Sequence, residues 1–345
     1  MTGRGVAFIL NDRFAEVKLE LEGAPRFAAT AHFTFHFAFV HRFFLGGISM
    51  SKKHPVVVVT GSSGAGTTTV KRAFEHIFTR EKLSAAVIEG DSMHSLGRVE
   101  FKEAMKKAEA AGNHSFSHFG PEANDFEGLA NMFMTYGETG AGKKRYYIHS
   151  DEEAAALNAR LGTDLKPGQF TPWEDMPSNT DILFYEGLHG LVVTDKVDMA
   201  KYVDLAVGVV PVVNLEWIQK IHQDAAERGY SAEAIVDTIL RRMPDYVNYV
   251  TPQFSRTDIN FQRVPLVDTS NPFIARDIPT PDESLVVVRF RNPKGVDFPY
   301  FLSMIPGSFM SRPNNLVVPG GKMGFAMEVI LGPIIEKLVE NSRKG

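Results

Sequence analysis

Apolar and polar positions along residues 50–345 form short apolar runs that alternate with longer amphipathic segments. The runs of strand length lie at residues 56–60, 85–91, 181–187 and 205–213, with further strand-like segments at 265–270 and 284–291. Helices are predicted at residues 68–80, 99–112, 125–136, 151–160, 214–229, 231–243 and 324–344. Strands that alternate with helices predict an α/β fold, with a mostly parallel, mixed sheet flanked by helices on both faces.

Residues 1–49 have a different pattern. Four alternate phenylalanines between Phe33 and Phe39 give a period of two, which predicts a strand. Histidine and arginine side chains interrupt this apolar segment, unlike the core of a secretory signal. We expect residues 1–49 to be an extension of uncertain origin outside the catalytic fold, and residues 50–345 to form one domain. The alternative for the extension is a genuine extra strand or an oligomer contact.

Composition excludes several classes of protein. The 345 residues carry a formal net charge of −4, which argues against a nucleic-acid coat or a general membrane-surface binder. No uncharged apolar run reaches the length of about 18 residues that a spanning helix needs. The absence of cysteine excludes disulfides, thiolate metal sites and cysteine nucleophiles, and it is compatible with the cytoplasm. We therefore expect a cytoplasmic protein with no nucleic-acid and no membrane partner.

The stretch VVVVTGSSGAGTTTV at residues 56–70 matches the phosphate-binding pattern G-x-x-x-x-G-K-[ST] except at the lysine position, which is Thr67. Gly61 and Gly66 have the required spacing, and Thr68 fits the hydroxyl position. The backbone N–H groups of such a loop bind phosphates without a lysine. We therefore expect a P-loop NTPase fold; a simple glycine-rich turn is the alternative. The expected nucleotide-binding residues are Gly61, Ser62, Ser63, Gly64, Ala65, Gly66, Thr67, Thr68 and Thr69.

Two acidic residues lie at the ends of predicted strands, Asp91 in IEGD and Glu186 in FYEG. In P-loop folds such strand ends lie beside the phosphates. One acid can then hold Mg²⁺, and the other can accept a proton from an attacking hydroxyl. Each acid alone could equally be a polar residue that ends a strand, but the pair favours a kinase over a simple nucleotide-binding protein.

Cationic side chains close to Asp91 in the sequence suggest capture of a phosphorylated substrate. His94 and Arg98 are four residues apart and would share one face of a helical turn. In KKRYYIHS, His149 is the candidate, whereas the two lysines fit a plain surface. Solvated surface charge is the alternative for these residues, and it is more credible for Arg98 than for His94.

The predicted helix at residues 214–229 carries Lys220, Asp224 and Arg228 at intervals of four, which places them on one face. A ladder of alternating charge is usually a solvated decoration. It becomes a candidate for the active site because the helix directly follows a predicted buried strand.

Longer strings within residues 50–345 carry a family resemblance. They are VVTGSSGAGTTTVK, VIEGDSMH, SFSHFGPEAN, YGETGAG, LFYEGLHG, GVVPVVNLEWIQKIH, DTILRRMPDYV, PQFSRTDINFQRVPLVDTSNPFIAR and SFMSR. With them the chain resembles the bacterial phosphoribulokinase family from Met50 to the C-terminus. The resemblance implies phosphorylation of the C1 hydroxyl of D-ribulose 5-phosphate by ATP with Mg²⁺, which gives ribulose 1,5-bisphosphate in the Calvin cycle. It also implies that threonine at position 67 is usual in this family.

The resemblance implies a role for each candidate residue. It assigns catalysis to Asp91, Asp224 and Lys220, Mg²⁺ binding to Glu186, Asp224 and Thr68, and substrate binding to His94, Arg98, His149 and Arg228. Arg241 and Arg242 match a region tied to allosteric control. The resemblance further implies a homo-octamer that is activated by NADH and inhibited by AMP.

One position departs from the family pattern, because Gln223 stands where arginine is usual before the second acid. Loss of a charge that stabilises a transition state commonly costs about 10²-fold or more in rate, unless Lys220 or Arg228 compensates. Two other hypotheses therefore stay open. One is a kinase of another small hydroxylated metabolite, such as a nucleoside, and the other is a non-catalytic nucleotide-sensing homologue.

Overall fold

The computed structural model describes residues 53–61, 67–210, 212–275 and 277–344, without the side chains of Thr67, Thr68, Glu227 and Arg228. These residues belong to the compact unit Ile48–Gly345. The strand predicted between residues 33 and 39 and the loop residues 62–66 lie outside the described residues.

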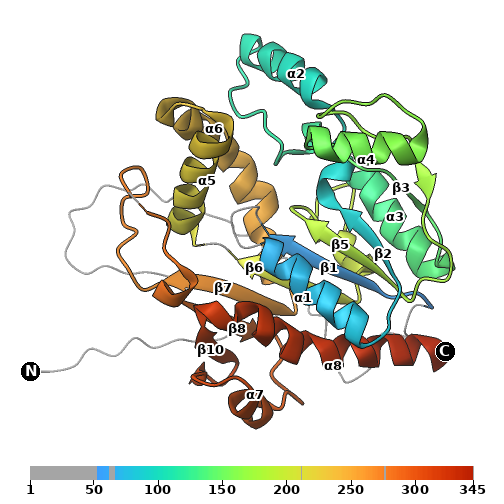
Figure 1. Ribbon diagram of the computed structural model, residues 1–345, viewed down its shortest axis with the longest axis vertical. Helices are drawn as coiled ribbons and strands as arrows, with labels where there is room; N and C mark the ends of the chain where they lie inside the picture. The colour runs from blue at the N-terminus through green and yellow to red at the C-terminus, as the bar shows by residue number, and fades with distance from the viewer. Residues whose placement is uncertain (1–52, 62–66, 211, 276, 345) are drawn as a thin grey trace, which may run out of the picture. The chain divides into compact units, whose positions relative to one another are not determined.

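Within the described residues, a sheet of eight strands forms the centre of the unit (Figure 1). The first part is parallel and runs in the order β2 Ala85–Glu89, β5 Ile182–Gly187, β1 Val56–Gly61, β6 Leu205–Val210 and β7 Ile259–Pro265. The second part is antiparallel and continues through β8 Ser284–Phe290, β10 Asn315–Pro319 and β9 Phe309–Arg312. The prediction of a mostly parallel, mixed sheet is confirmed.

Helices flank this sheet (Figure 1). They are α1 Thr67–Arg80, α2 Arg98–Ala110, α3 Phe126–Thr139, α4 Asp151–Leu161, α5 Val213–Arg228, α6 Ala232–Asp245, α7 Phe298–Met304 and α8 Met323–Lys344. A separate antiparallel pair joins β3 Lys143–Lys144 to β4 Glu174–Asp175. In the described part of the chain, none of the helices combines the length and hydropathy needed to cross a bilayer.

The central strand β1 is buried on both faces, and its side chains alternate between two apolar cores. Val57 and Val59 pack into the core that α1 and α8 cover, whereas Val56 and Val58 pack into the core that α3 covers. This explains the uninterrupted VVVV run, since a strand covered on both faces needs apolar residues at every position. The β1 backbone is therefore held by packing from both sides.

Local sequence signals set several helix boundaries as expected. The Ser231 side chain accepts a hydrogen bond from the backbone N–H of Ala234 and caps α6. Gly229 ends α5 with a φ of 65°, a left-handed conformation that favours glycine. Both residues lie at the ends of the helices predicted at residues 214–229 and 231–243.

Two strand predictions need correction. The strand predicted at residues 265–270 is wrong, because the chain forms β7 at Ile259–Pro265 and the following Leu266 and Val267 are exposed. The strand predicted at 205–213 ends at Val210, and α5 already begins at Val213.

Candidate active site

The carboxyl ends of β2 and β5 bring the two predicted acids to the same edge of the sheet. Glu89 lies opposite Glu186 in the parallel pairing of these strands, and Glu186 lies opposite Val59 of β1. The chain leaves β2 through one short turn of 3-10 helix, Gly90–Met93, which carries Asp91. Ligands of open α/β sheets bind at this edge, and here it also holds the end of β1, from which the phosphate loop departs.

Two glycines let these strand ends approach each other. A Cβ on Gly90 would lie 2.8 Å from the Cα of Gly187 and 2.8 Å from the hydroxyl of Tyr185. A Cβ on Gly187 would in turn lie 2.7 Å from the Cα of Gly90. Since neither position has room for a side chain, the glycines of the EGD and YEG strings fix the spacing between the backbones that carry the two acids.

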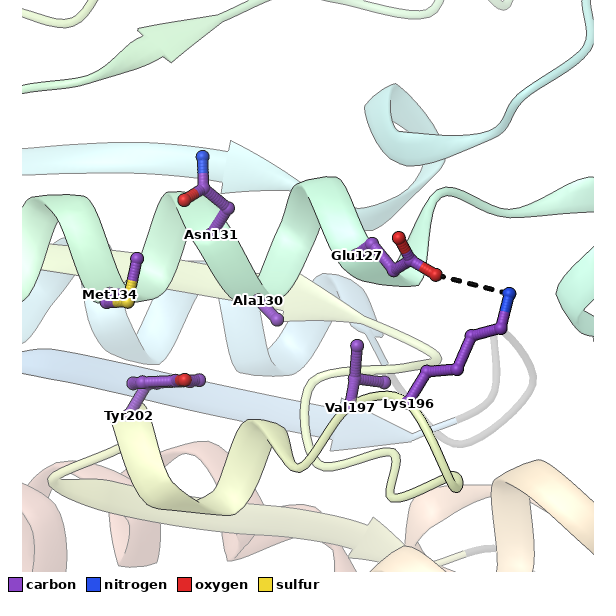
Figure 2. A pocket seen from close by; sticks show the side chains of 7 residues that line it. All are labelled: Glu127, Ala130, Asn131, Met134, Lys196, Val197 and Tyr202. Carbon is purple, nitrogen blue, oxygen red and sulfur yellow. Dashed lines mark ion pairs between the residues drawn. The ribbon is translucent and has the colours of Figure 1, made fainter.

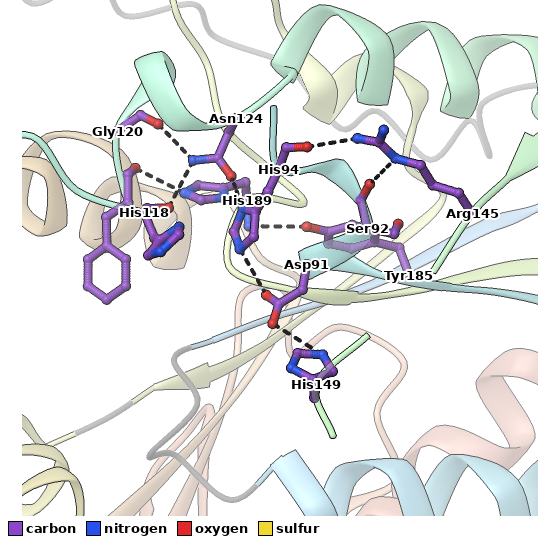
Figure 3. A network of polar contacts seen from close by, with 11 residues as sticks. Asp91, Ser92, His94, His118, Gly120, Asn124, Arg145, His149, Tyr185 and His189 are labelled. Atoms are coloured by element: carbon purple, nitrogen blue, oxygen red, sulfur yellow. Dashed lines mark hydrogen bonds and ion pairs between the residues drawn. The ribbon is translucent and has the colours of Figure 1, made fainter. Parts of the chain in front are cut away.

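The Asp91 carboxylate lies between two histidines that come from different segments (Figure 3). Oδ1 is 3.4 Å from Nε2 of His94, and Oδ2 is 3.6 Å from Nε2 of His149. The Asp91 side chain is 47% exposed, so a substrate hydroxyl can reach it. His94 is almost fully buried, whereas His149 is about half exposed.

The environments of the two acids move their pKa values in opposite directions. Burial acts to raise the pKa of Asp91, but the hydrogen bond and charge of His94, with the charges of His149 and His118, lower it to about 2. Burial raises the pKa of Glu186 to about 7, and the negative charges of Asp91 and Glu89 add to this effect. Asp91 is therefore ionised near neutral pH, whereas the charged form of Glu186 is disfavoured there.

A lysine on α1 faces the same acids. Nζ of Lys71 lies 3.3 Å from Oε1 of Glu89, and the charge of Glu89 raises the pKa of Lys71. The charge of Lys71 also acts to lower the pKa of Glu186. Lys71 follows Thr67, the position where the phosphate-loop pattern has its lysine, by one helical turn of α1.

Arg145 ties the segment that carries His149 to the segment that carries Asp91 and His94. Its Nε donates to the carbonyl oxygen of Ser92 at 2.8 Å, and its Nη2 donates to that of His94 at 2.7 Å (Figure 3). The guanidinium also packs on the rings of Phe170 and Trp173, at 3.9 and 4.7 Å from their centroids. Arg145 thus holds the backbone on both sides of Met93.

Arg98 joins this cluster through His149 rather than through His94. Its Nη2 donates to the carbonyl oxygen of His149 at 3.3 Å. The expectation that His94 and Arg98 share a helical turn is wrong, because Arg98 is the first residue of α2 and His94 lies before that helix in a β-bridge with Asn124. His94 and His149 nevertheless flank the Asp91 carboxylate, and Arg98 contacts the backbone of His149.

The second predicted acid has a partner on its own helix. Nζ of Lys220 lies 2.5 Å from Oδ2 of Asp224, and Asp224 is buried. The reading of this pair as a solvated decoration therefore does not hold. The side chain of Arg228 is not among those described, and neither are the side chains of Thr67 and Thr68 or the loop at residues 62–66. Thr69, also predicted to bind the nucleotide, lies in the first turn of α1.

The two arginines predicted to have an allosteric role contact the region around the site. Arg241 of α6 pairs with Glu109 of α2 and lies 3.0 Å from Asp237. Arg242 lies over the ring of Phe119, at 5.1 Å from its centroid. The first contact connects α6 to α2, and the second connects α6 to the segment between α2 and α3.

A separate pocket of about 450 Å³ opens between α3 and the segment that includes Tyr202 (Figure 2). Ala130, Met134 and Val197 give it an apolar wall, and Glu127 pairs with Lys196 at 3.4 Å across its mouth. None of the predicted site residues lines this pocket.

Comparison with known proteins agrees with this geometry. The family model described as phosphoribulokinase / uridine kinase matches residues 56–270. A phosphoribulokinase of Nitrobacter vulgaris is 59% identical over 295 residues, which is 86% of this chain and 100% of that protein. A chromosomal phosphoribulokinase of Cupriavidus necator is 60% identical over 295 residues, 86% of this chain and 99% of its own.

The chain belongs to the phosphoribulokinase / uridine kinase family. The solved phosphoribulokinase of Rhodobacter spheroides has the same fold, with a TM-score of 0.77 and 56% identity, over 85% of this chain and 100% of that one. The match to this P-loop kinase structure confirms the predicted fold class.

Four residues of the site in this family member were not singled out from the sequence. They are Asn124, His118, Arg145 and His189, and all belong to the polar network of Figure 3. Arg145 was visible in KKRYYIHS, and the other three lie in SFSHFGPEAN and LFYEGLHG. The available signal was two histidines and an asparagine in these strings, because polar side chains buried beside a site need hydrogen-bond partners.

A kinase of this family needs Mg²⁺ with its nucleotide, and the acids at the sheet edge fit that ion. Mg²⁺ usually takes one or two carboxylates together with phosphate oxygens and water. Among the residues that the structure describes, no group of three or more His, Asp or Glu side chains forms a metal cage. Glu186 is a carboxyl whose charged form burial and neighbouring acids disfavour, which is the situation that a bound cation relieves.

Proposed function

We propose that this chain transfers the γ-phosphoryl group of ATP to the C1 hydroxyl of D-ribulose 5-phosphate and so forms ribulose 1,5-bisphosphate and ADP. The observation that carries the proposal is the ionised, solvent-accessible Asp91, held between His94 and His149 at the edge where the phosphate loop begins. The similarity to phosphoribulokinases along nearly the whole of their length supports the choice of substrate.

Asp91 is suited to align the attacking hydroxyl and to take up its proton. With a pKa of about 2 it is a weak base, so it does not remove the proton before the attack. In the loose transition state of phosphoryl transfer the hydroxyl becomes acidic only as its oxygen bonds to phosphorus. The oxygen on C1 then bonds to the γ-phosphorus while the bond from that phosphorus to the β–γ bridging oxygen breaks. The proton of the hydroxyl moves to Asp91.

The surrounding cations are suited to the phosphate already on the sugar. His149 is half exposed beside Asp91, and the exposed Arg98 donates to its carbonyl oxygen, so the two side chains lie on neighbouring segments. A nucleoside has no phosphate for these groups to bind, which favours a phosphorylated sugar over a nucleoside. On this proposal, Arg228 of α5 also contributes to substrate binding.

Glu186 would hold Mg²⁺ together with the nucleotide phosphates, with the hydroxyl of Thr68 as a further ligand. Mg²⁺, when bound, supplies positive charge to the phosphate oxygens during transfer. Asp224, buried and paired with Lys220, is the second acid of this proposal, and Lys220 is the cation that neutralises charge on the moving phosphoryl group.

ADP release tests the proposal when it is measured with Mg-ATP, with and without ribulose 5-phosphate. We expect sugar-dependent turnover in the parent chain, and a loss of at least about 10²-fold in Asp91→Asn with ATP binding retained. The Gln223→Arg variant should have activity similar to that of the parent. No turnover in the parent together with recovery in Gln223→Arg would support the non-catalytic homologue instead.

The assembly and its control also follow from family resemblance. We propose a cytoplasmic homo-octamer that NADH activates and AMP inhibits, with Arg241 and Arg242 taking part in the response. Light scattering should then give a mass about eight times that of the chain, as expected for a closed symmetric octamer. A monomeric mass, or turnover unchanged by both nucleotides, would contradict this part of the proposal.

A further inference from the structure

Asn124 lies behind the histidine that faces Asp91, and all of its side-chain polar atoms have partners (Figure 3). Its Nδ2 donates to the carbonyl oxygens of His118 at 2.8 Å and Gly120 at 2.7 Å. Its Oδ1 lies 2.8 Å from Nδ1 of His94. Asn124 and His94 are both buried, each with 7% of its surface exposed.

These partners fix the orientation of the amide. The two carbonyl oxygens can only accept hydrogen bonds, so the amide nitrogen must face them. A flipped amide would aim its oxygen at two other oxygens, and both donors would be lost. Oδ1 of Asn124 therefore faces His94, and Nδ1 of His94 must carry a proton to donate to it.

The state of the other ring nitrogen follows from this bond. If His94 were neutral, its only proton would be on Nδ1, and Nε2 would turn a lone pair toward the carboxylate of Asp91 at 3.4 Å. A proton on Nε2 as well makes the ring an imidazolium that donates to both acceptors. The geometry thus favours the imidazolium, because each ring nitrogen of His94 faces an acceptor, Asn124 on one side and Asp91 on the other.

We propose that Asn124 is a positioning residue for the kinase reaction. By accepting the Nδ1 proton, it keeps His94 an imidazolium whose Nε2 donates to Asp91, and so keeps Asp91 ionised and aligned for the sugar hydroxyl. This inference rests on the proposed function, because it assigns a purpose to the hydrogen-bonded chain that ends at Asp91.

The other charged groups around His94 have opposing effects on its protonation, so the hydrogen bond from Nδ1 to Asn124 matters. Asp91 favours the imidazolium, whereas the guanidinium of Arg145 and the ring of His149, when protonated, oppose it. His118 lies 4.9 Å from His94 between ring centroids, and burial lowers its pKa to about 3. Burial likewise lowers the pKa of His189 to about 4.

His118 and His189 therefore add no positive charge beside His94 near neutral pH. The Nδ1 atom of His118 is buried without a hydrogen-bond partner among the described residues, which suits a neutral ring. The nearby Arg242 acts to lower the pKa of His118 further. With these rings uncharged, Asp91 and Asn124 together can hold one positive charge on His94.

The test compares Asn124→Leu with Asn124→Asp in the full-length chain, by the pH profile of kcat/KM for ribulose 5-phosphate. Leucine removes the acceptor, so His94 should lose its proton at lower pH. The alkaline limb of the pH profile should therefore shift to lower pH by about one unit, and kcat/KM at pH 8 should fall about tenfold. Aspartate restores an acceptor toward His94, so the alkaline limb should return toward the parental position, although its second oxygen faces the carbonyl oxygens of His118 and Gly120 and should lower the stability of the fold.

Asn131→Leu is the matched control, since Asn131 lies exposed on α3 outside the network, and it should leave the profile unchanged. If leucine and aspartate both lower the rate without moving the limb, Asn124 has only a structural role and the proposal is overturned.

A second measurement does not depend on activity. In the parent chain with ¹⁵N-labelled histidine, NMR at pH 7 should show both nitrogens of His94 protonated, with His94→Gln to assign the signals. A neutral ring at that pH would overturn the proposal. An imidazolium in a chain without sugar-dependent turnover would support the hydrogen-bonded state inferred for His94 and refute the proposed function alone.

Discussion

Glu186 and Asp91 show how one site gives two carboxyl groups different properties. Asp91 has two imidazoles within 3.6 Å, whereas Glu186 is partly buried beside two other acids, whose charge Lys71 only partly balances. The first group stays charged in water and suits contact with a hydroxyl. The second is held in an unfavourable charged state that a cation would relieve.

The raised pKa of Glu186 predicts a stability effect that depends on pH. The folded chain retains the proton that the unfolded chain releases above the ordinary value of 4.5, so the free energy of unfolding falls as pH rises from 4.5 to about 7. Glu186→Gln removes this cost. Without Mg²⁺ and nucleotide, we expect the variant to be more stable than the parent by about 1–2 kcal/mol at pH 8, and equal to it at pH 4.

Urea denaturation at the two pH values measures this difference. Glu103→Gln is the control, because Glu103 lies exposed on α2, and it should show no such pH dependence. A Glu186→Gln variant that is less stable than the parent at pH 8 would show that the Glu186 carboxylate is well stabilised in the folded protein, contrary to this account.

At the scale of elements, the contact between the ends of β2 and β5 sets the positions of the acids. We predict that Gly90→Ala destabilises the fold by about 1–3 kcal/mol, because the new Cβ would lie 2.8 Å from the backbone of Gly187 and the strand ends would have to separate. Turnover should fall as well, since Asp91 directly follows Gly90.

Gly142→Ala is a matched control for this variant. The nearest atoms to its new Cβ belong to the flexible side chain of Met176 at 3.1 Å, so thermal unfolding should change little. Equal melting temperatures for Gly90→Ala and Gly142→Ala would mean that the contact between the strand ends does not constrain the site.

The sequence predicted those elements whose local signals agree with their packing. The helix after the phosphate loop was found because Val70, Phe74 and Ile77 follow a helical period and enter one core. The strand β7 was missed because its apolar residues are interrupted by Asn260, which is buried through hydrogen bonds to Thr257 and Phe254. An apolar pattern cannot reveal a strand whose polar residue has a tertiary partner.

The same distinction applies to the site. Asp91 and Glu186 were predictable because strand ends of a parallel sheet gather at one edge. Asn124 and Arg145 lie in the connecting region between residues 113 and 180, where periodicity is weak. Their contacts with His94 and Ser92 depend on how that region folds back over the sheet, which no local pattern specifies.

At the scale of the whole molecule, the described fold and the similarity to relatives both concern the chain after residue 47. We predict that a chain beginning at Met50 folds with the same free energy of unfolding, within about 0.5 kcal/mol. It should also keep the kcat/KM of the full chain, because every proposed site residue follows Met50. Denaturation and steady-state kinetics of the two chains measure this, and loss of turnover on truncation would give residues 1–49 a part in the catalytic fold.

The proposed reaction accounts for the whole arrangement of acids and cations at the sheet edge, and identification of the product tests it most directly. The full chain would be incubated with Mg-ATP and either ribulose 5-phosphate or uridine, with phosphorus NMR of the products and kcat/KM for each acceptor. The account predicts a product with a second phosphomonoester, on C1 of the sugar. It also predicts a kcat/KM for ribulose 5-phosphate at least about 10³-fold higher than for uridine, because a nucleoside has no phosphate to pair with the cations of the site. Phosphorylation of uridine at a similar or higher kcat/KM, or of neither compound, would contradict it.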